Sequence, residues 1–416
     1  MTSTENEVIL KLRQSNTVSL MLVTALLLQL CMSKVDAGSP QSYQSRNFQL
    51  YTDLSEADAK ELLVRLETMV HLVSAYFGKP IRKPIRMFVV DNLEDWSNAE
   101  LSQMHPDGLR SIQTGGGLTV TEVQGIIGGP KIDADAIVYA VSARQTPQHE
   151  AVHAYCGITF GSTGPVWYSE GMAEVGKYWA DGEKGVNASQ YVIDYLRSHP
   201  PKPLMEIVNN PLEQTGDSWQ NYAWRWALCH LLGFNENYTK RFKPLGLALL
   251  ADQNISFAKV YGSQAQEIEF EYLQFLEHLS RGYRCDLCSW DWQTKFRVAN
   301  PRTPLISKIL SERGWQASRA IVKSGQSYAV EAKGTWALSS ESDAVDAGGD
   351  VTGKGRLVGT IFSDYKLSEE FEIGDADNFT APADGNLFLR CRDDWSELAD
   401  NDGVIEVRIQ SIRSVD

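Results

Sequence analysis

Two histidines one helical turn apart lie in the middle of the chain, with a glutamate between them. His149, Glu150 and His153 form the pattern H-E-x-x-H. On a helix, positions i and i+4 share one face, so both imidazoles can reach a single metal ion. Two neutral imidazoles suit zinc, and Glu150 is placed to take a proton from a water molecule that the ion activates. The pattern predicts a hydrolytic zinc centre with Glu150 as its general base.

The segments around this motif predict the elements that position it. Residues 135–141 form a short apolar run that is typical of a buried strand. Residues 144–156 carry apolar side chains at helical spacing. Gly157, Gly161 and Gly164 follow, and we expect them to end the helix and open a turn. The motif is therefore expected on a helix that comes soon after a strand.

The segment after this turn offers a third metal ligand. Residues 166–174 read VWYSEGMAE, and 16 residues separate His153 from Glu170. Catalytic zinc commonly has three protein ligands and one open position for water. Glu174 is the alternative ligand, because it lies one helical turn beyond Glu170 on the same face. We expect Glu170 to bind zinc and Glu174 to accept a hydrogen bond that orients a ligating histidine.

Together these two segments resemble a known enzyme clan. HEAVH followed by WYSEGMAE is similar to the gluzincin metallopeptidases, and most similar to the peptidase-MA-like families of secreted bacterial proteins. The likeness covers about residues 46–280, with a spacing between the motifs slightly shorter than in aminopeptidases. It implies an α+β zincin-like domain, with zinc held by His149, His153 and Glu170.

The region before the motif is compatible with that layout. Residues 48–52 and 85–90 predict strands, and residues 55–77 predict a long amphipathic helix between them. The run GGGLTVT at 115–121 resembles the edge strand that borders the cleft in this clan, although its glycines are equally compatible with a plain turn. An edge strand can pair with an extended peptide substrate through main-chain hydrogen bonds.

A further catalytic group is expected downstream. Residues 221–232 read NYAWRWALCHLL, which predicts a helix with an aromatic-rich face, and MA-like relatives often carry a similar segment. Tyr222 or His230 could donate a hydrogen bond to the oxyanion that forms when water attacks the carbonyl. Core packing is the alternative for both residues. We interpret Trp224 and Trp226 as core residues.

A second unit is expected from residue 300 onward. The sequence NPRT at 300–303 is linker-like, and short strands with Gly and Asp turns begin after Gly314. Such regular strands predict an all-β sandwich of about 100 residues. The predicted strands are 320–322, 327–332, 357–362, 371–373, 387–391 and 404–409.

The end of this unit resembles a bacterial calcium-dependent galactose-binding lectin. The likeness rests on GTWA at 334–337, GNLFLRCRDD at 385–394 and DNDG at 400–403. It implies a jelly-roll or lectin-like domain that binds a surface or a glycan, although the sugar-contacting loop of that lectin is not recognisable here.

The same resemblance implies a second metal site. Carried over, Asp393, Asp400 and Asn401 are calcium ligands, with carbonyl groups near Ser339 and Glu397 completing the set. Oxygen donors clustered on one loop suit Ca²⁺. The alternative is a polar turn stabilised by its own side-chain hydrogen bonds.

The N-terminus and the charge bear on location. Basic residues precede an apolar run at 17–32, and small residues near Ala37 suit a cleavage site, which predicts a signal peptide over residues 1–37. An uncleaved membrane anchor is the alternative. The net charge of −14 argues against nucleic-acid partners. We therefore expect a signal peptide (1–37), a metallopeptidase domain (38–299) and a sandwich domain (300–416) in a secreted, periplasmic or cell-surface protein.

Cysteine usage adds one structural expectation. In an oxidising compartment, Cys285 and Cys288 are interpreted as a local disulfide, whereas Cys156 and Cys229 are expected to be buried as apolar residues.

The sequence thus predicts a zinc-dependent peptidase that acts on peptides or proteins and carries an accessory β-sandwich. The alternative is a catalytically silent zincin-like protein that binds carbohydrate or cell wall.

Overall fold

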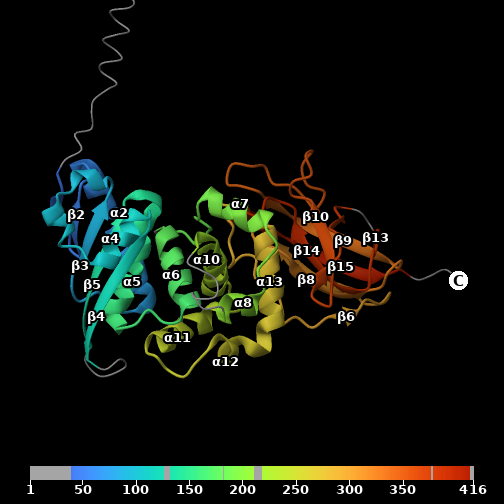
Figure 1. Cartoon of the computed structure of the whole chain (residues 1–416). Helices are drawn as coiled ribbons and strands as arrows, with labels where there is room; N and C mark the ends of the chain where they lie inside the picture. The colour runs from blue at the N-terminus through green and yellow to red at the C-terminus, as the bar shows by residue number, and fades with distance from the viewer. Residues whose placement is uncertain (1–38, 126–131, 181, 210–217, 376–377, 413–416) are drawn as a thin grey trace, which may run out of the picture.

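A computed structural model describes residues 39–125, 132–180, 182–209, 218–375 and 378–412. In these ranges the chain forms a mixed α and β part, coloured blue to yellow in Figure 1, followed by a β part coloured orange to red. The predicted signal peptide at 1–37 lies outside the described residues. No helix within the described ranges combines the length and hydropathy that a membrane crossing needs.

A five-stranded mixed sheet forms one end of the molecule. Its strand order is β1-β2-β3-β5-β4; β2, β3 and β5 run parallel, and β1 and β4 pair antiparallel at the two edges. The predicted strands are confirmed, and the glycine-rich run leads into an edge strand and is not merely a turn. The strands are β1 (Gln41–Gln44), β2 (Phe48–Thr52), β3 (Ile85–Val90), β4 (Gly117–Gly125) and β5 (Ile132–Val141).

The predicted long helix is confirmed as α2 (Glu56–Phe77), which connects β2 to β3. Its start is capped, because Ser55 accepts a hydrogen bond from the backbone N–H of Asp58. Its apolar stripe faces the sheet. The buried residues of the stripe are Ala59, Leu62, Leu63, Leu66, Met69, Val70, Val73 and Phe77.

Helices cover both faces of the sheet. On one face, α2 and α5 (Thr146–Phe160) share a core with Leu50 of β2 and Val138 of β5. The neighbouring residue of β5, Tyr139, points to the other face, where α3 (Asn98–Leu101) and α4 (Pro106–Gln113) lie. The sheet is therefore a middle layer, and α5 has its buried side against β4 and β5.

One predicted helix end is wrong. Gly157 was expected to end the motif helix, but α5 continues to Phe160. The reason is a close approach, since a Cβ atom on Gly157 would lie 2.6 Å from Oγ1 of Thr121 on β4. Gly157 thus lets the helix lie against the strand. Gly161, with φ of 73°, ends the helix as predicted.

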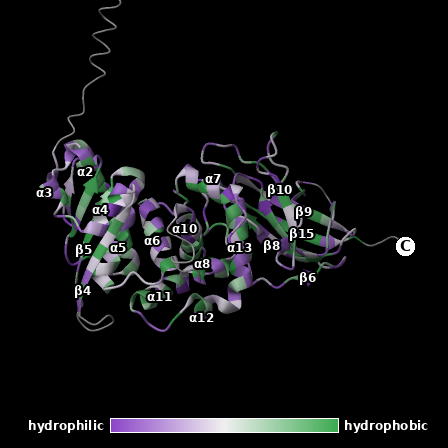
Figure 2. Cartoon of the chain, in the orientation of Figure 1, coloured by the Kyte–Doolittle hydropathy of each residue, from purple (hydrophilic) through white to green (hydrophobic). Residues whose placement is uncertain are grey.

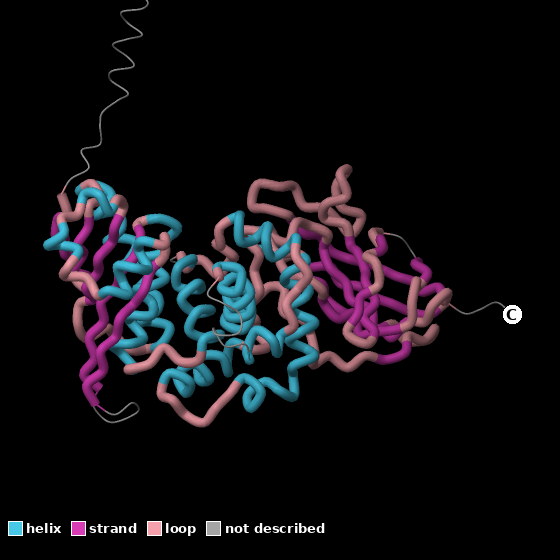
Figure 3. Tube along the Cα trace, viewed as in Figure 1, coloured by secondary structure: helices cyan, strands magenta, loops and turns pink. Residues whose placement is uncertain are grey.

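A bundle of helices follows, and Figure 3 shows it in cyan between the sheet and the β part. Its central helix is α10, which packs on α6 and is flanked by α7, α8, α11 and α13. Trp224, Trp226, Cys156 and Cys229 are all buried, as predicted. The helices are α6 (Val166–Tyr178), α7 (Gln190–Ser198), α8 (Leu204–Asn209), α10 (Trp219–Phe234), α11 (Thr239–Leu250), α12 (Phe257–Tyr261) and α13 (Ala265–Glu277).

The β part contains two sheets around a second core, which confirms a sandwich; the described strands pair antiparallel except β6, which pairs parallel with β8. One sheet has the order β11-β10-β14-β8-β6 with β12 beside β10, and the other has the order β13-β9-β15-β7. All six predicted strands are present. The strands are β6 (Arg297–Val298), β7 (Leu305–Leu310), β8 (Gln316–Val322), β9 (Ser327–Ala337), β10 (Leu357–Ser363), β11 (Lys366–Leu367), β12 (Phe371–Glu372), β13 (Asn378–Thr380), β14 (Gly385–Cys391) and β15 (Asp402–Ser411).

Hydrophobic and hydrophilic residues intermix along the helices and strands of both parts (Figure 2), as expected of elements with one buried and one exposed side. The two parts also pack on each other. Phe270 of α13 and Trp290 form a buried cluster with Phe388 of β14, and the rings of Trp290 and Phe388 have their centroids 4.0 Å apart. The sandwich is thus docked on the helical bundle by aromatic side chains.

The predicted disulfide is absent from the structure. Cys285 and Cys288 are both free thiols. Cys285 is buried in the core of the helical bundle, whereas Cys288 lies at its margin, where a Cβ atom on Gly314 would be 3.5 Å from its Sγ. The two side chains therefore pack in different places, Cys285 in the core and Cys288 next to Gly314.

Candidate metal centre

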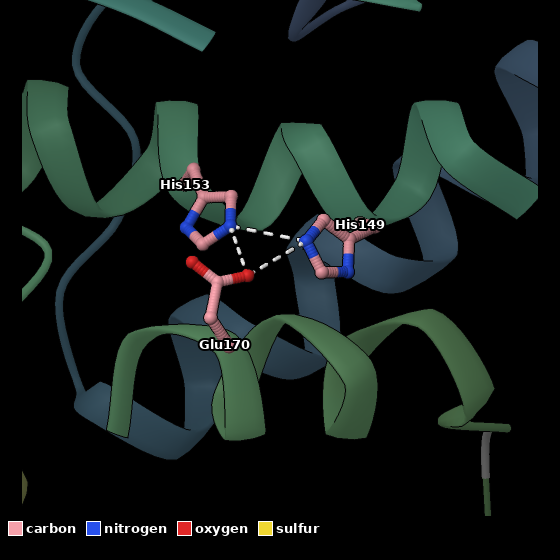
Figure 4. Close-up of side chains that lie close together, drawn as sticks. All are labelled: His149, His153 and Glu170. Atoms are coloured by element: carbon pink, nitrogen blue, oxygen red, sulfur yellow. Dashed lines mark hydrogen bonds and ion pairs between the residues drawn. The ribbon is translucent and has the colours of Figure 1, made fainter. Parts of the chain in front are cut away.

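The two helices that carry the motif residues lie side by side. His149 and His153 come from α5, and Glu170 comes from α6, which follows after the turn at Gly161. Figure 4 shows the three side chains pointing toward one another from the two helices. Gly176 of α6 permits this approach, because a Cβ atom there would lie 2.5 Å from a methyl group of Val152 on α5.

The three side chains offer one donor atom each to a common point. Nε2 of His149 and Nε2 of His153 are 3.1 Å apart, and Oε2 of Glu170 lies 3.2 Å and 3.4 Å from them. Zinc–ligand bonds of about 2.0–2.1 Å in a tetrahedron place neighbouring ligands about 3.3 Å apart. The donor set therefore fits zinc in both chemical type and spacing, and three donors leave a fourth position open.

The outer nitrogens of both rings have partners of their own. Nδ1 of His149 lies 2.9 Å from Oε1 of Glu174, and Nδ1 of His153 lies 3.2 Å from Oγ of Ser169. Lys177 in turn donates to both oxygens of Glu174, at 3.1 Å and 3.2 Å. An imidazole that donates Nδ1–H to a carboxylate keeps the Nε2 lone pair for a metal. Glu174 thus stands in the orienting position, and Glu170 faces both Nε2 atoms.

The centre combines strong burial with excess negative charge. His149 is 7% exposed. Burial lowers the pKa of His149, but its hydrogen bonds and charge interactions with Glu170 and Glu174 outweigh this and raise the pKa to about 10. Burial also raises the pKa of Glu170, yet the charge of His153 and the hydrogen bonds from both histidines bring it well below its usual range. The pocket of donors therefore attracts a cation, which is a proton when no metal is present.

Glu150, the residue after His149 on α5, is held by the edge strand β4. Oγ1 of Thr119 on β4 lies 2.8 Å from Oε2 of Glu150 and 2.9 Å from the Glu150 carbonyl oxygen, so the hydroxyl can donate to either. Gly117 provides the space, because a Cβ atom there would lie 2.7 Å from Cγ of Glu150. The edge strand thus positions the predicted general base.

Of the two predicted oxyanion donors, one lies at the centre. The ring of Tyr222 on α10 is 5.6 Å from that of His149, centroid to centroid. His230 instead packs among the rings of Trp226, Phe234 and Phe275. Burial lowers the pKa of His230 to about 3, so it is a neutral core residue. The structure therefore supports core packing, the alternative interpretation, for His230.

Sequence reasoning missed several residues that support the centre. Ser169, Lys177 and Thr119 each touch a motif residue, but none belongs to the H-E-x-x-H pattern. Lys177 could have been found from its spacing, since it lies three residues after Glu174 on one helix. Thr119 lies in the run at 115–121 that was expected to border the cleft, but its contact with Glu150, 31 residues away in the chain, had no signal of its own.

The predicted calcium ligands are only partly together. Asp393 and Asn401 are buried, whereas Asp400 is exposed. The carboxylates that converge are those of Asp393, Asp394 and Glu397, and Asp400 is not part of this described cluster. The calcium site stays a prediction.

No protein-family model matches this chain. No curated protein matches it either. Among solved structures, the EclA N-terminal domain, a PllA-like lectin, is similar over 26% of this chain and 96% of that chain, with 18% sequence identity and a TM-score of 0.23. A likeness this weak supports no conclusion about what the chain binds.

Proposed function

We propose that this chain is a zinc-dependent peptidase. The observation that carries the proposal is the convergence of two imidazole nitrogens and one carboxylate oxygen, none farther than 3.4 Å from another. Both histidines have separate partners for Nδ1, so their Nε2 atoms, which both face Glu170, are the nitrogens that would bind a metal. The resemblance to gluzincin peptidases, stated from the two motifs, gives the same ligand set.

When bound at these donors, zinc would supply a Lewis acid that makes water more acidic and polarises the substrate carbonyl. Glu150 would accept a proton from the attacking water and then pass it to the leaving amine, while a new C–O bond forms and the C–N bond breaks. Thr119 would hold the Glu150 carboxylate in place during both transfers. Tyr222, beside His149, is the candidate donor to the oxyanion.

A peptide substrate is supported by the edge strand. Among the described strands, β4 pairs only with β5, so its other edge offers main-chain N–H and C=O groups. An extended peptide could add to such an edge as a further strand. Because Gly117 of β4 contacts Glu150, a substrate paired there would pass close to the proposed base.

The accessory role of the sandwich, binding to a glycan or a cell surface outside the cell, is supported only by the sequence resemblance. The alternative function is a catalytically silent binding protein. An intact donor set with a positioned Glu150 favours the enzyme, since a binding protein has no need of the base.

The test is cleavage of a mixed peptide library by zinc-loaded residues 38–416, analysed by mass spectrometry. Its matched control is Glu150→Gln, which keeps the size of the side chain and one oxygen that can accept from Thr119, but not the basicity of the carboxylate. We expect the wild type to cleave, a chelator to abolish cleavage and added zinc to restore it. We expect Glu150→Gln to bind one zinc per chain and to lose about 10²–10⁴-fold in rate.

Full activity of Glu150→Gln would overturn the proposed mechanism. Failure of the wild type to bind zinc would overturn the metal centre itself. Zinc binding without cleavage by either protein would favour the silent binding protein.

A further inference from the structure

An ammonium group lies at the centre of the acidic cluster in the sandwich. Nζ of Lys354 is 2.9 Å from Asp394, 3.1 Å from Glu397 and 3.2 Å from Asp393, measured to one carboxylate oxygen of each. The three carboxylates also converge on one another, with one oxygen from each within 4.8 Å of the others. We call these four residues the Lys354 cluster.

The buried member of the cluster needs a cation. The Asp393 side chain is 1% exposed, and both of its oxygens are buried without a hydrogen bond from any described residue. A buried carboxylate in this state is costly unless a positive charge compensates it. The ion pair with Lys354 supplies that charge. Oδ1 of Asn401 is likewise buried without a partner among the described residues.

Hydrogen bonds of the surrounding backbone fix the position of Lys354. Asp350 accepts hydrogen bonds from the backbone N–H groups of Thr352 and Lys354, and the N–H of Gly355 donates to the carbonyl of Arg392. The loop around Lys354 is therefore fixed against the segment that carries the three carboxylates.

These contacts do not fit a bound calcium ion. Calcium takes six to eight oxygen ligands, and a second cation in the same cluster would repel it. Asp400, one of the expected ligands, is exposed and outside the cluster. We propose that the ammonium of Lys354 takes the place of a metal ion here, so that the sandwich is independent of calcium and replacing Lys354 creates a calcium site.

The segment held by this ammonium is also a docking element. Trp395 lies between Asp394 and Glu397 in the chain, and its ring stacks on His278 of the helical part at 4.2 Å between centroids. The Arg390 guanidinium lies 4.2 Å from the centroid of the same ring. Next to it, a Cβ atom on Gly282 would lie 2.9 Å from the carbonyl oxygen of Ser396. Lys354 therefore stabilises a loop that holds the two parts together.

The experiment compares the thermal unfolding of the full chain in a calcium chelator and in millimolar calcium. Four proteins are measured: the wild type, Lys354→Ala, Lys354→Arg, and the double variant Lys354→Ala with Asp393→Asn. Calorimetric titration with calcium gives the number of ions bound. The wild type and Lys354→Arg should show no calcium response. Lys354→Ala should melt lower in chelator, bind one calcium and regain several degrees, whereas the double variant should show neither binding nor recovery.

Two outcomes would overturn the proposal. One is a wild type that binds calcium or melts higher with it, because the ammonium would then not occupy the site. The other is a Lys354→Ala variant that neither binds calcium nor melts higher with it, because the cluster would then be an ordinary surface ion pair. A Lys354→Ala variant that folds only with calcium would support the proposal. The calcium independence of the sandwich is decided by the wild-type measurement, which needs no variant.

Discussion

Nδ1 of His149 lies 2.9 Å from Oε1 of Glu174, and this contact decides which nitrogen of His149 faces Glu170. Because Nδ1 faces a carboxylate that Lys177 also holds, Nε2 is the nitrogen that points to the other donors, and it would give its lone pair to a metal once its proton is lost. Two acidic residues one turn apart on α6 thus face different nitrogens of His149, Glu170 facing Nε2 and Glu174 facing Nδ1.

This arrangement predicts the effect of Glu174→Gln. The variant keeps the size of the side chain but loses the charge that holds the His149 ring, so zinc affinity should fall about 10–100-fold. Competition with a chromophoric chelator measures it. Glu267→Gln, a change at another helical glutamate outside the centre, serves as the control. Unchanged zinc affinity in Glu174→Gln would refute the orienting role.

Thr119 should matter for turnover rather than for zinc. Thr119→Val removes the hydroxyl but keeps the shape, and a hydrogen bond to a charged group contributes about 1.5–3 kcal/mol. We expect kcat to fall about 10–100-fold with unchanged zinc content, and Thr119→Ser to retain most of the rate. Steady-state kinetics on the cleaved peptide test this. A change in KM alone would show that Thr119 contacts substrate instead of positioning Glu150.

Metal binding should be linked to protons. The pKa of His149, about 10 in the metal-free fold, lies above the ordinary value of about 6.5, so the imidazole is protonated at neutral pH. Zinc needs the neutral ring. Zinc uptake should therefore release a proton, and affinity should rise about tenfold per pH unit up to that pKa. Calorimetry in buffers of different ionisation enthalpy measures the number of protons released. If zinc uptake releases no proton, the raised pKa of His149 is contradicted.

The same shift affects the metal-free protein. A folded-state pKa raised above the unfolded value contributes stability that is fully present below about pH 6.5 and is lost as the pH rises through about 10. The metal-free chain should therefore melt progressively lower with rising pH. The decline should be smaller in His149→Gln, where no imidazole titrates, and equal slopes for both proteins would argue against the raised pKa.

The contact between α5 and α6 sets the donor spacing. Gly176→Ala places a methyl group against Val152, which is 1% exposed and has little freedom to move. Overpacking of this kind costs about 1–3 kcal/mol. We expect a lower melting temperature together with weaker zinc binding, and partial recovery of both in Gly176→Ala with Val152→Ala. Normal zinc affinity in the single variant would show that the helices adjust independently.

Trp395 should couple the unfolding of the two parts. Trp395→Ala removes the stacking on His278 and the cation–π contact with Arg390, each worth about 0.5–2 kcal/mol. Differential scanning calorimetry should then show two transitions in place of one. Tyr191→Ala, which removes an aromatic side chain from a residue of α7 that is 64% exposed, is the control. A single transition in Trp395→Ala would mean that other contacts dominate the interface.

The sequence predicted helices and strands best where a local pattern of residues determines where the element begins and ends. The strand at 85–90 matches at both ends because apolar residues and strand formers stop there together. The helix expected over residues 55–77 begins at Glu56, and Ser55 is its cap. The strand β7 was not predicted. Only alternate residues of LISKIL are buried, and its register depends on pairing with β15 about a hundred residues later.

The features that the sequence did not predict depend on contacts between segments that are distant in the chain. Gly157 was read as a helix end because its need for close approach to β4 is visible only when Thr121 lies beside it. The Lys354 cluster joins a lysine to carboxylates some forty residues later, so the resemblance to a calcium-dependent lectin could not reveal that a cation is already there.

The two helices that supply the donors belong to different layers. α5 packs on the sheet through β4 and β5, whereas α6 packs on α10 of the bundle. The proposed metal position therefore lies where these two helices meet, beside the one hydrophobic core that they share. An ion held by His149, His153 and Glu170 would join α5 and α6 directly, so metal binding is expected to stabilise the contact between these two helices.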